Sequence, residues 1–181
     1  DGEVIKASKR SGKAITLVDL LDEVPIDAVR FLFNMREAGS AMDFDLDLAV
    51  EQSNQNPVYY CQYAHARICS ILRKLETEGV KIRKPEKEEL TLLNSDEETD
   101  LIAHLASLTN VIIFAANSYD PARITHYATE LATKFHRFYN AQRVMVDDES
   151  LMQARIFLCQ CVKRTMKNVL SMLKIEAPES M

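Results

Sequence analysis

The sequence contains little glycine, proline or cysteine, and these shortages narrow the choice of fold. Four glycines and five prolines in 181 residues argue against a fold of sheets and tight turns. The four cysteines include no C-x-x-C pair and do not form a disulfide framework, so a reduced, cytoplasmic setting fits best. A composition of 47% hydrophobic and 27% charged residues is typical of a soluble globular protein.

Signals for membranes and secretion are also missing. No apolar run approaches the ~20 residues that a spanning helix needs, so we expect no membrane partner. The first residues, Asp1 to Glu3, lack the apolar region of a signal peptide, and there is no initiator Met. We therefore expect a cytoplasmic protein that is a processed product or a piece of a longer chain.

Charge is distributed unevenly along the chain, although the net charge is only −5. Residues 76–100 hold nine acidic and four basic side chains, whereas residues 123–174 hold nine basic and four acidic ones. The local field decides whether a polyanion can dock, so the second stretch could face a nucleic acid. Ordinary solvated helix faces explain the same numbers equally well.

In the first third of the chain, the residue pattern predicts a mobile loop over the first ~15 residues, followed by two short helices and a linker. Thr16 and Asp19 form a capping box at the start of the first helix. The second begins near Pro25, buries Ile26, Val29, Phe33 and also Leu32, and ends at Gly39. The alternating "MDFDLDLA" has no partner strand in view, so we expect an extended linker there.

Four long amphipathic patterns follow, which predict an all-α fold built as an antiparallel helix bundle. Their start signals are Asn56-Pro57, the capping box of Ser95 with Glu98, Asp120-Pro121, and either Asp147 or Asp148. The inward positions repeat every three or four residues. In the third helix these are Ile124, Ala128, Leu131, Phe135 and Phe138, and in the fourth Leu151, Ala154, Leu158, Val162, Met166, Val169 and Leu173.

A basic loop, "KASKRSGKA", precedes these helices. It is not a Walker A loop, because Ala7 stands where that motif needs its first Gly and Ala14 where it needs Ser or Thr. Four basic residues in eight are too few for a nuclear-localisation run. The stretch Lys6-Ala7-Ser8-Lys9-Arg10 resembles the K-M-S-K-S signature of class I aminoacyl-tRNA synthetases.

Longer stretches carry the same resemblance over nearly the whole chain. "PIDAVRFLF" (25–33), "FDLDLAVEQSNQNPVYYCQYAHARI" (44–68), "ITHYATELATKFHRFYN" (124–140) and "APESM" (177–181) are similar to the arginyl-tRNA synthetase family. The resemblance implies that residues 1–47 are the C-terminal end of a catalytic domain, with a signature loop and a short helical stem. It implies that residues 48–181 are a helical anticodon-binding domain. The family's ATP-binding H-I-G-H motif would lie upstream.

The resemblance also implies roles for individual residues. Lys6, Ser8 and Lys9 of the signature loop would close over the phosphates of ATP, which the intact enzyme uses with Mg²⁺. This charge stabilisation helps to join arginine to its tRNA through an arginyl-adenylate. The piece by itself would be inactive and, we expect, monomeric.

Recognition of the anticodon arm of arginine tRNA would fall to the helical domain. Tyr60 and Tyr63 share a helix face and could stack splayed bases, although tyrosines on a bundle helix are more often part of the core. By resemblance Tyr60 ranks first, Met181 lies near the anticodon and Asn140 orders the anticodon loop; Asn140 could instead cap its helix. The charge asymmetry adds Arg143 and Lys163 as phosphate contacts.

Cys61, His65 and Cys69 share another helix face at i, i+4 and i+8. This spacing can ligate a metal, but no further ligand has support, so we expect buried thiols, a hydrogen-bonded histidine and no metal site. Two other classes stay open at this point. A non-enzymatic helical interaction module explains the bundle but not the lysine loop. A phosphate-binding enzyme of another class would need further catalytic groups.

Overall fold

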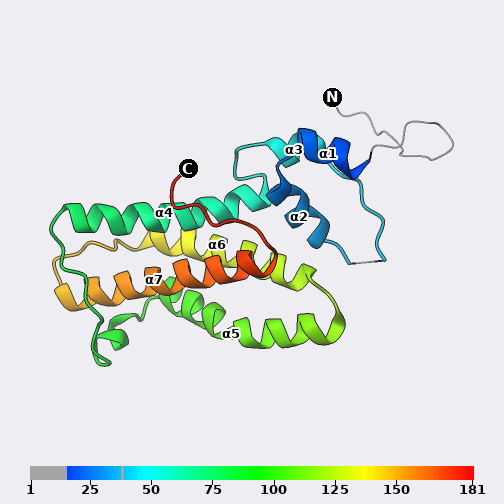
Figure 1. Ribbon diagram of the computed structural model, residues 1–181. Helices are drawn as coiled ribbons and strands as arrows, with labels where there is room; N and C mark the ends of the chain where they lie inside the picture. Colours follow the sequence, from blue (N-terminus) through cyan, green and yellow to red (C-terminus); the bar gives the residue numbers. More distant parts are fainter. Residues whose placement is uncertain (1–15, 38) are drawn as a thin grey trace.

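The computed structural model describes residues 16–37 and 39–181, and every regular element in this part of the chain is helical (Figure 1). The expected mobile loop and the candidate phosphate-binding residues Lys6, Ser8 and Lys9 lie outside the described residues. The elements are α1 (Leu17–Glu23), α2 (Ile26–Asn34), α3 (Leu46–Val50), α4 (Pro57–Thr77), the 3₁₀-helix η1 (Glu89–Leu92), α5 (Asp96–Ser118), α6 (Ala122–Ala141) and α7 (Glu149–Met172).

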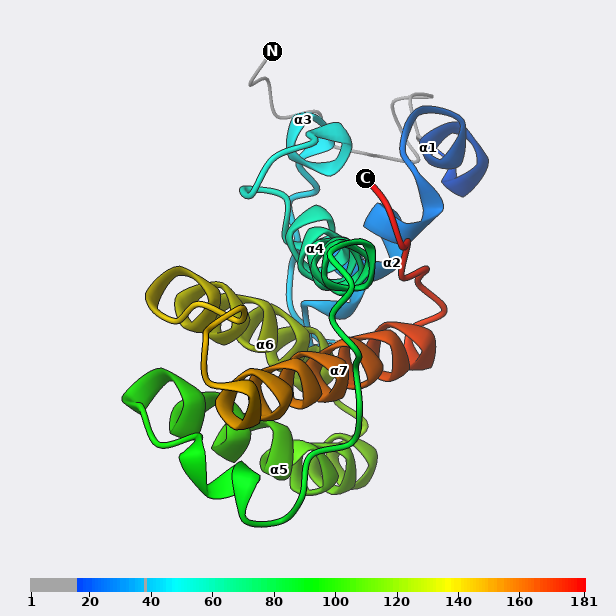
Figure 2. The same ribbon diagram turned by 90° about the vertical axis from the view of Figure 1, so that its left-hand side faces the viewer.

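Helices α4 to α7 form the antiparallel bundle that the sequence predicts. Helices α4, α6 and α7 pack against one another around a shared core, and α5 lies outside them, mainly against α6 (Figures 1 and 2). The core is fully buried at Ile68, Leu131, Phe135, Phe138 and Met166. All five inward positions expected in α6 are buried, because the helix is enclosed by α4, α5 and α7.

The predicted caps explain where most of the helices begin. Asn56 caps α4 with Pro57 in its first turn, and Ser95 and Glu98 form the capping box of α5. Thr16 and Asp19 do the same for α1, and of the two aspartates proposed for α7 the cap is Asp148. Each cap gives a partner to a backbone N–H that the helix leaves free.

Helix α2 differs from the prediction in where it ends and in half of its buried stripe. Helix α2 ends at Asn34, well before Gly39. Of its expected stripe, Val29 and Leu32 are buried, but Ile26 and Phe33 are each 48% exposed. Ala28 and Phe31 complete the buried side of the helix, which meets α4 and α6. Phe33 rests on Phe44, with the ring centroids 5.4 Å apart.

The "MDFDLDLA" segment is not wholly extended. Its second half forms the short helix α3, because the Asp45 carboxylate accepts a 2.9 Å hydrogen bond from the Leu48 N–H and so caps a helical turn. Alternating apolar and acidic residues therefore fit a capped helix as well as an extended chain.

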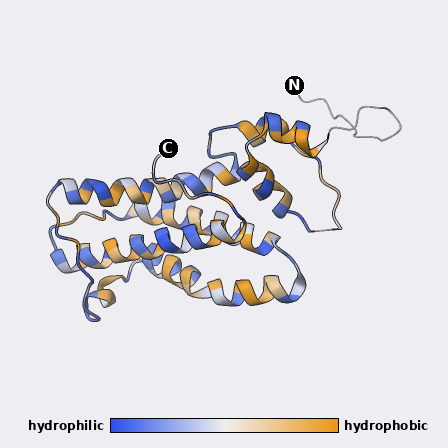
Figure 3. Cartoon of the chain, in the orientation of Figure 1, coloured by the Kyte–Doolittle hydropathy of each residue, from blue (hydrophilic) through white to orange (hydrophobic). Residues whose placement is uncertain are grey.

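Helix α5 corrects the expectation that no apolar run is long enough for a bilayer. Residues 101–118 contain no Asp, Glu, Lys or Arg. Among the described residues, α5 is the one helix long and apolar enough to cross a membrane by length and composition. Figure 3 shows how hydrophobic its second half is, and Ile113 and Phe114 are exposed.

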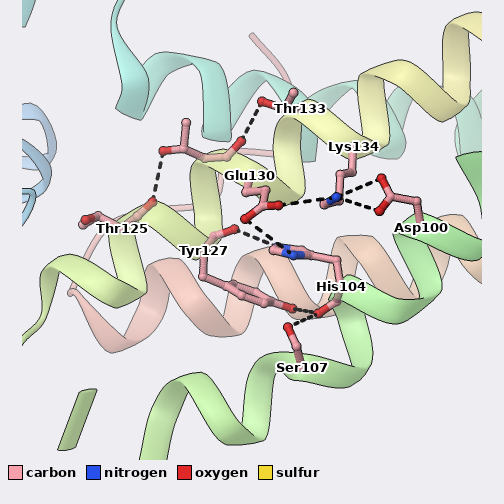
Figure 4. A network of polar contacts seen from close by, with 9 residues as sticks. Asp100, His104, Ser107, Thr125, Tyr127, Glu130, Thr133 and Lys134 are labelled. Atoms are coloured by element: carbon pink, nitrogen blue, oxygen red, sulfur yellow. Dashed lines mark hydrogen bonds and ion pairs between the residues drawn. The ribbon is translucent and has the colours of Figure 1, made fainter. Parts of the chain in front are cut away.

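Polar contacts nevertheless hold α5 to α6 as a bundle helix (Figure 4). The His104 ring stacks on Tyr127 at 4.2 Å, and its Nε2 lies 3.2 Å from the Tyr127 carbonyl oxygen. The Tyr127 hydroxyl donates in return to the His104 carbonyl at 3.1 Å. Lys134 of α6 bonds both carboxylate oxygens of Asp100 at 2.8 Å. These pairs fix the register of the two helices.

Candidate nucleic-acid interface

Six side chains gather where α4 and α6 lie side by side, and we call them the aromatic–arginine cluster. Tyr60, Tyr63 and Arg67 follow one face of α4 because they are three and four residues apart. His136 and Tyr139 are three apart on α6. The cluster consists of Tyr59, Tyr60, Tyr63, Arg67, His136 and Tyr139.

The rings of the cluster stack in a continuous series. Tyr59 and Tyr63 are nearly parallel, with centroids 6.2 Å apart and planes 5° apart. Tyr63 stacks in turn on His136 at 5.9 Å, and Tyr60 contacts His136 at 5.0 Å. The two tyrosines that the sequence singles out therefore meet at one histidine. All five rings of the cluster are half-buried, so each is held in place while part of it remains accessible.

Arg67 joins the two helices and was missed in the sequence. Its guanidinium carbon lies 4.6 Å from the ring centroid of Tyr139 and 5.7 Å from that of Tyr63. A guanidinium plane over aromatic faces is a cation–π arrangement, and both groups can stack on unpaired bases. Its spacing of four residues from Tyr63 is the signal that could have revealed it.

His136 is neutral at physiological pH. Burial, followed by the nearby Arg67 charge, lowers the pKa of His136 to about 4. The Arg67 guanidinium donates to His136 Nδ1 at 3.5 Å, and His136 Nε2 is buried without a hydrogen-bond partner among the described residues. Arg67 is thus the charged member of the cluster.

The chain end lies beside a groove of about 660 Å³ between α2, the α3–α4 segment and α4. Met181 lines this groove together with Tyr59 and Gln62. Since Tyr59 also belongs to the aromatic–arginine cluster, the groove and the cluster adjoin. Met181, a predicted tRNA contact, thereby lines the same groove as Tyr59 although the two are far apart in sequence.

The other predicted contacts neither belong to the aromatic–arginine cluster nor line the groove. Asn140 follows Tyr139 in the last turn of α6 and does not cap that helix, whose cap is Gln142. Arg143 is exposed in the loop before α7, and Lys163 of α7 pairs with Glu179 at 3.5 Å.

The basic stretch supplies less free charge than its sequence indicates. Arg155 is buried against Glu98, with its Nε 2.7 Å from the carboxylate, and its other nitrogens bond the Arg143 carbonyl and the Gln142 side chain. Lys134 is held by Asp100 and Glu130. Neither cation is available to a polyanion.

Cys61, His65 and Cys69 are buried in the bundle, as expected from their shared face. Burial raises the pKa of the Cys61 thiol to about 12. His65 Nδ1 lies 2.8 Å from the Pro178 carbonyl oxygen, so this nitrogen carries the proton and donates. In the part of the chain that the structure describes, no group of three or more His, Cys, Asp or Glu side chains could hold a metal ion.

The arrangement of helices α4 to α7 is that of a known class of helical domain. Residues 61–181 match the family model of the DALR anticodon binding domain, and the chain belongs to this family. Over 180 residues it is 53% identical to an arginine–tRNA ligase of Caldanaerobacter subterraneus, covering 99% of the chain and 32% of the relative. The corresponding ligase of Ruminiclostridium cellulolyticum is 49% identical over 181 residues, which are 100% of the chain and 32% of that relative.

Solved structures agree with these relatives. The arginyl-tRNA synthetase of Thermus thermophilus superposes with a TM-score of 0.73 at 27% identity, over 96% of this chain and 29% of that one. The Plasmodium falciparum enzyme, at 22% identity, shares the fold with a TM-score of 0.75 over 92% of this chain and 29% of that one. The family resemblance is therefore confirmed, and an unrelated interaction module is not favoured. The chain spans about a third of the length of its curated relatives.

Proposed function

We propose that this chain is the tRNA-reading part of an arginine–tRNA ligase and binds the anticodon arm of arginine tRNA. The aromatic–arginine cluster carries the proposal. Half-buried tyrosines and a guanidinium, held on two rigid helices, offer flat surfaces on which splayed anticodon bases can stack, each stack contributing ~1–3 kcal/mol. The adjoining groove with Met181 would give a base edge further contacts.

The intact ligase would act in the bacterial cytoplasm as a monomer and would use ATP with Mg²⁺ and arginine. The close relatives are bacterial arginine–tRNA ligases, which supports this assignment. In our proposal Lys6, Ser8 and Lys9 serve the ATP phosphates of that enzyme, and residues 1–47 belong to its catalytic domain. The 181-residue chain would then catalyse neither arginylation nor ATP–pyrophosphate exchange.

Binding to arginine tRNA, compared with a tRNA of another specificity, tests the proposal. Tyr60→Ala should weaken binding about tenfold or more, because the loss of one stack is of the order of 1.4 kcal/mol. Tyr60→Phe keeps the ring and should weaken binding less. Tyr119→Ala is the matched control, since Tyr119 is 91% exposed at the end of α5.

Thermal stability must be measured on the same variants, because Tyr60 also packs against the core. A destabilised Tyr60→Ala protein that binds normally when folded would assign Tyr60 to the core and shift the base contact to Tyr63. Equal affinity for both tRNAs in every variant would contradict anticodon reading altogether.

Arg67→Lys separates stacking from charge. Lysine keeps the positive charge but lacks the planar group that lies over Tyr139. We expect weaker binding to arginine tRNA with little change in its salt dependence. Charge reversal at Arg143 or Lys163 should instead weaken binding to any tRNA alike. Each variant loses a phosphate contact, so its binding releases fewer counterions.

A further inference from the structure

The last eight residues, 174–181, form a strap that leaves α7 and runs along α2 and α4 (Figures 1 and 2). The strap begins with Lys174 in the left-handed region at φ 57°, which turns the chain away from the helix axis. Ile175 is buried in the core and anchors this first turn. Beyond it, the strap has no regular structure of its own.

Side chains of α2 hold the first part of the strap. The Arg30 guanidinium donates to the Lys174 carbonyl at 2.6 Å, and the Glu176 N–H donates to the Asp27 carboxylate at 3.1 Å. The same Asp27 oxygen accepts from Gln62 Nε2 of α4 at 3.1 Å. Asp27 therefore connects both helices with the strap.

Side chains of α4 hold the remainder. Gln62 Nε2 donates to the Glu176 carbonyl at 3.0 Å, and His65 Nδ1 to the Pro178 carbonyl at 2.8 Å. About two turns further along α4, Arg73 donates to the Glu179 carbonyl at 3.1 Å. All of these bonds reach the backbone of the strap, so they fix its path whatever side chains the strap carries.

We infer that Asp27, Arg30, Gln62 and His65 are positioning residues, which clamp the strap through its backbone and thereby set Met181 at the edge of the groove. The inference rests on the proposed function for its consequence in tRNA binding. Two of these residues lie on α2, within the predicted stem, so the clamp also joins the stem to the tRNA-reading surface. Disturbing α2 should then weaken recognition without touching the aromatic–arginine cluster.

Asp27→Ala tests the clamp, with Asp22→Ala as the control because Asp22 is an exposed carboxylate of α1 with the same charge. Hydrogen exchange of the strap amides should become faster in Asp27→Ala and stay unchanged in Asp22→Ala. Affinity for arginine tRNA should fall about fivefold or more, the lower end of typical coupling between sites. Asp27→Asn keeps one acceptor oxygen and should recover part of both effects.

Arg30→Ala removes an independent bond of the same clamp, so it keeps the test decisive if Asp27→Ala does not fold. Unchanged strap exchange in both variants would overturn the clamp. Faster exchange with unaltered tRNA affinity would overturn the positioning role. If the parent chain binds no tRNA, the proposed function fails, while the exchange data still decide whether these side chains hold the strap.

Discussion

Apolar side chains are mostly buried in the helical bundle but mostly exposed in α1, which precedes it. In α6 and α7, most of the side chains at core spacing are enclosed, as at Leu131, Phe135 and Val169, and only the end positions Leu151 and Leu173 of α7 are half-buried. Helix α1 buries no residue, although Leu17, Val18 and Leu21 are all apolar, and Val18 is 68% exposed. The bundle is therefore stabilised by its own packing, whereas α1 is held by its capping box and by the half-buried Leu20, which packs against the core.

This difference shows which signals in a sequence are local. A cap satisfies nearby N–H groups wherever a helix lies, but a buried face needs a partner to cover it. The relatives of this chain are about three times as long, which supports our proposal that the first 47 residues belong with a preceding catalytic domain. In this proposal, contact between the catalytic domain and α1 would cover the exposed apolar side chains of α1.

The largest expected effect is the loss of stability when the buried ion pair between Glu98 and Arg155 is broken. Arg155→Met leaves the Glu98 carboxylate uncompensated in the core, so the free energy of unfolding should fall by about 3–5 kcal/mol. Denaturant unfolding measures this. Arg143→Met is the matched control on an exposed arginine and should change little.

The double variant Arg155→Met with Glu98→Gln sharpens the interpretation. Glutamine keeps the capping box of α5 and removes the unpaired charge, so most of the lost stability should return. If the double variant is as unstable as Arg155→Met, the loss comes from the other arginine bonds, to Arg143 and Gln142, and not from the charge.

The bundle could be predicted closely because its local and long-range signals agree. Asn56 and Asp148 cap helices whose apolar residues repeat in phase with their buried faces. In α2 and α3 this agreement fails. The burial of Phe31 and the exposure of Ile26 depend on where α4 and α6 lie, which the local pattern does not contain.

The candidate site was predictable only within single elements. Tyr60 and Tyr63 share a face by spacing, so their proximity follows from the sequence. His136 and Tyr139 join them only through the packing of α6 on α4. The clamp on the strap could not be predicted from local sequence patterns, because Asp27 and Glu176 are 149 residues apart.

A second effect, the dependence of stability on pH, arises in the bundle and not in the segment before it. Burial lowers the pKa of His136 from 6.5 to about 4 and that of His65 in the same direction, while residues 16–50 contain no histidine. The folded chain therefore binds fewer protons than the unfolded chain between these values. The free energy of unfolding should fall as the pH drops through this window, by up to roughly 1.4 kcal/mol per unit for one group.

Urea unfolding at pH 7 and pH 5 measures the loss, with His136→Gln as the comparison. Glutamine does not titrate, so the variant should lose less stability than the parent and keep only the part due to His65. The lowered pKa of Glu89 costs stability only between its ordinary value of 4.5 and about 2, which is below the pH 5 end of this comparison. Equal losses in parent and variant would exclude His136 as a source of acid sensitivity.

A smaller effect compares the same motif in both regions. Ser95→Ala removes the cap of α5, which packs on the bundle, and should lower the free energy of unfolding by about 1 kcal/mol. Thr16→Ala removes the equivalent cap of α1, whose unfolding exposes no buried side chain, so global stability should barely change. Hydrogen exchange should still detect the loss, as faster exchange confined to α1. A global loss of similar size in both variants would mean that α1 is part of the cooperative unit.

The smallest effect concerns the exposed apolar surface itself. Val18→Ser replaces an exposed side chain in α1 and should change the free energy of unfolding by less than about 0.5 kcal/mol. Val169→Ser makes the same chemical change at a fully buried position in α7, where a cavity and an unpaired hydroxyl together should cost several times more. In a longer protein that includes the preceding domain, our proposal predicts that Val18 is covered. Val18→Ser should then lower the stability of that protein while leaving the 181-residue chain unaffected. Equal insensitivity of both chains would show that the surface of α1 faces solvent in the whole protein, and the proposed contact with the catalytic domain would have to lie elsewhere.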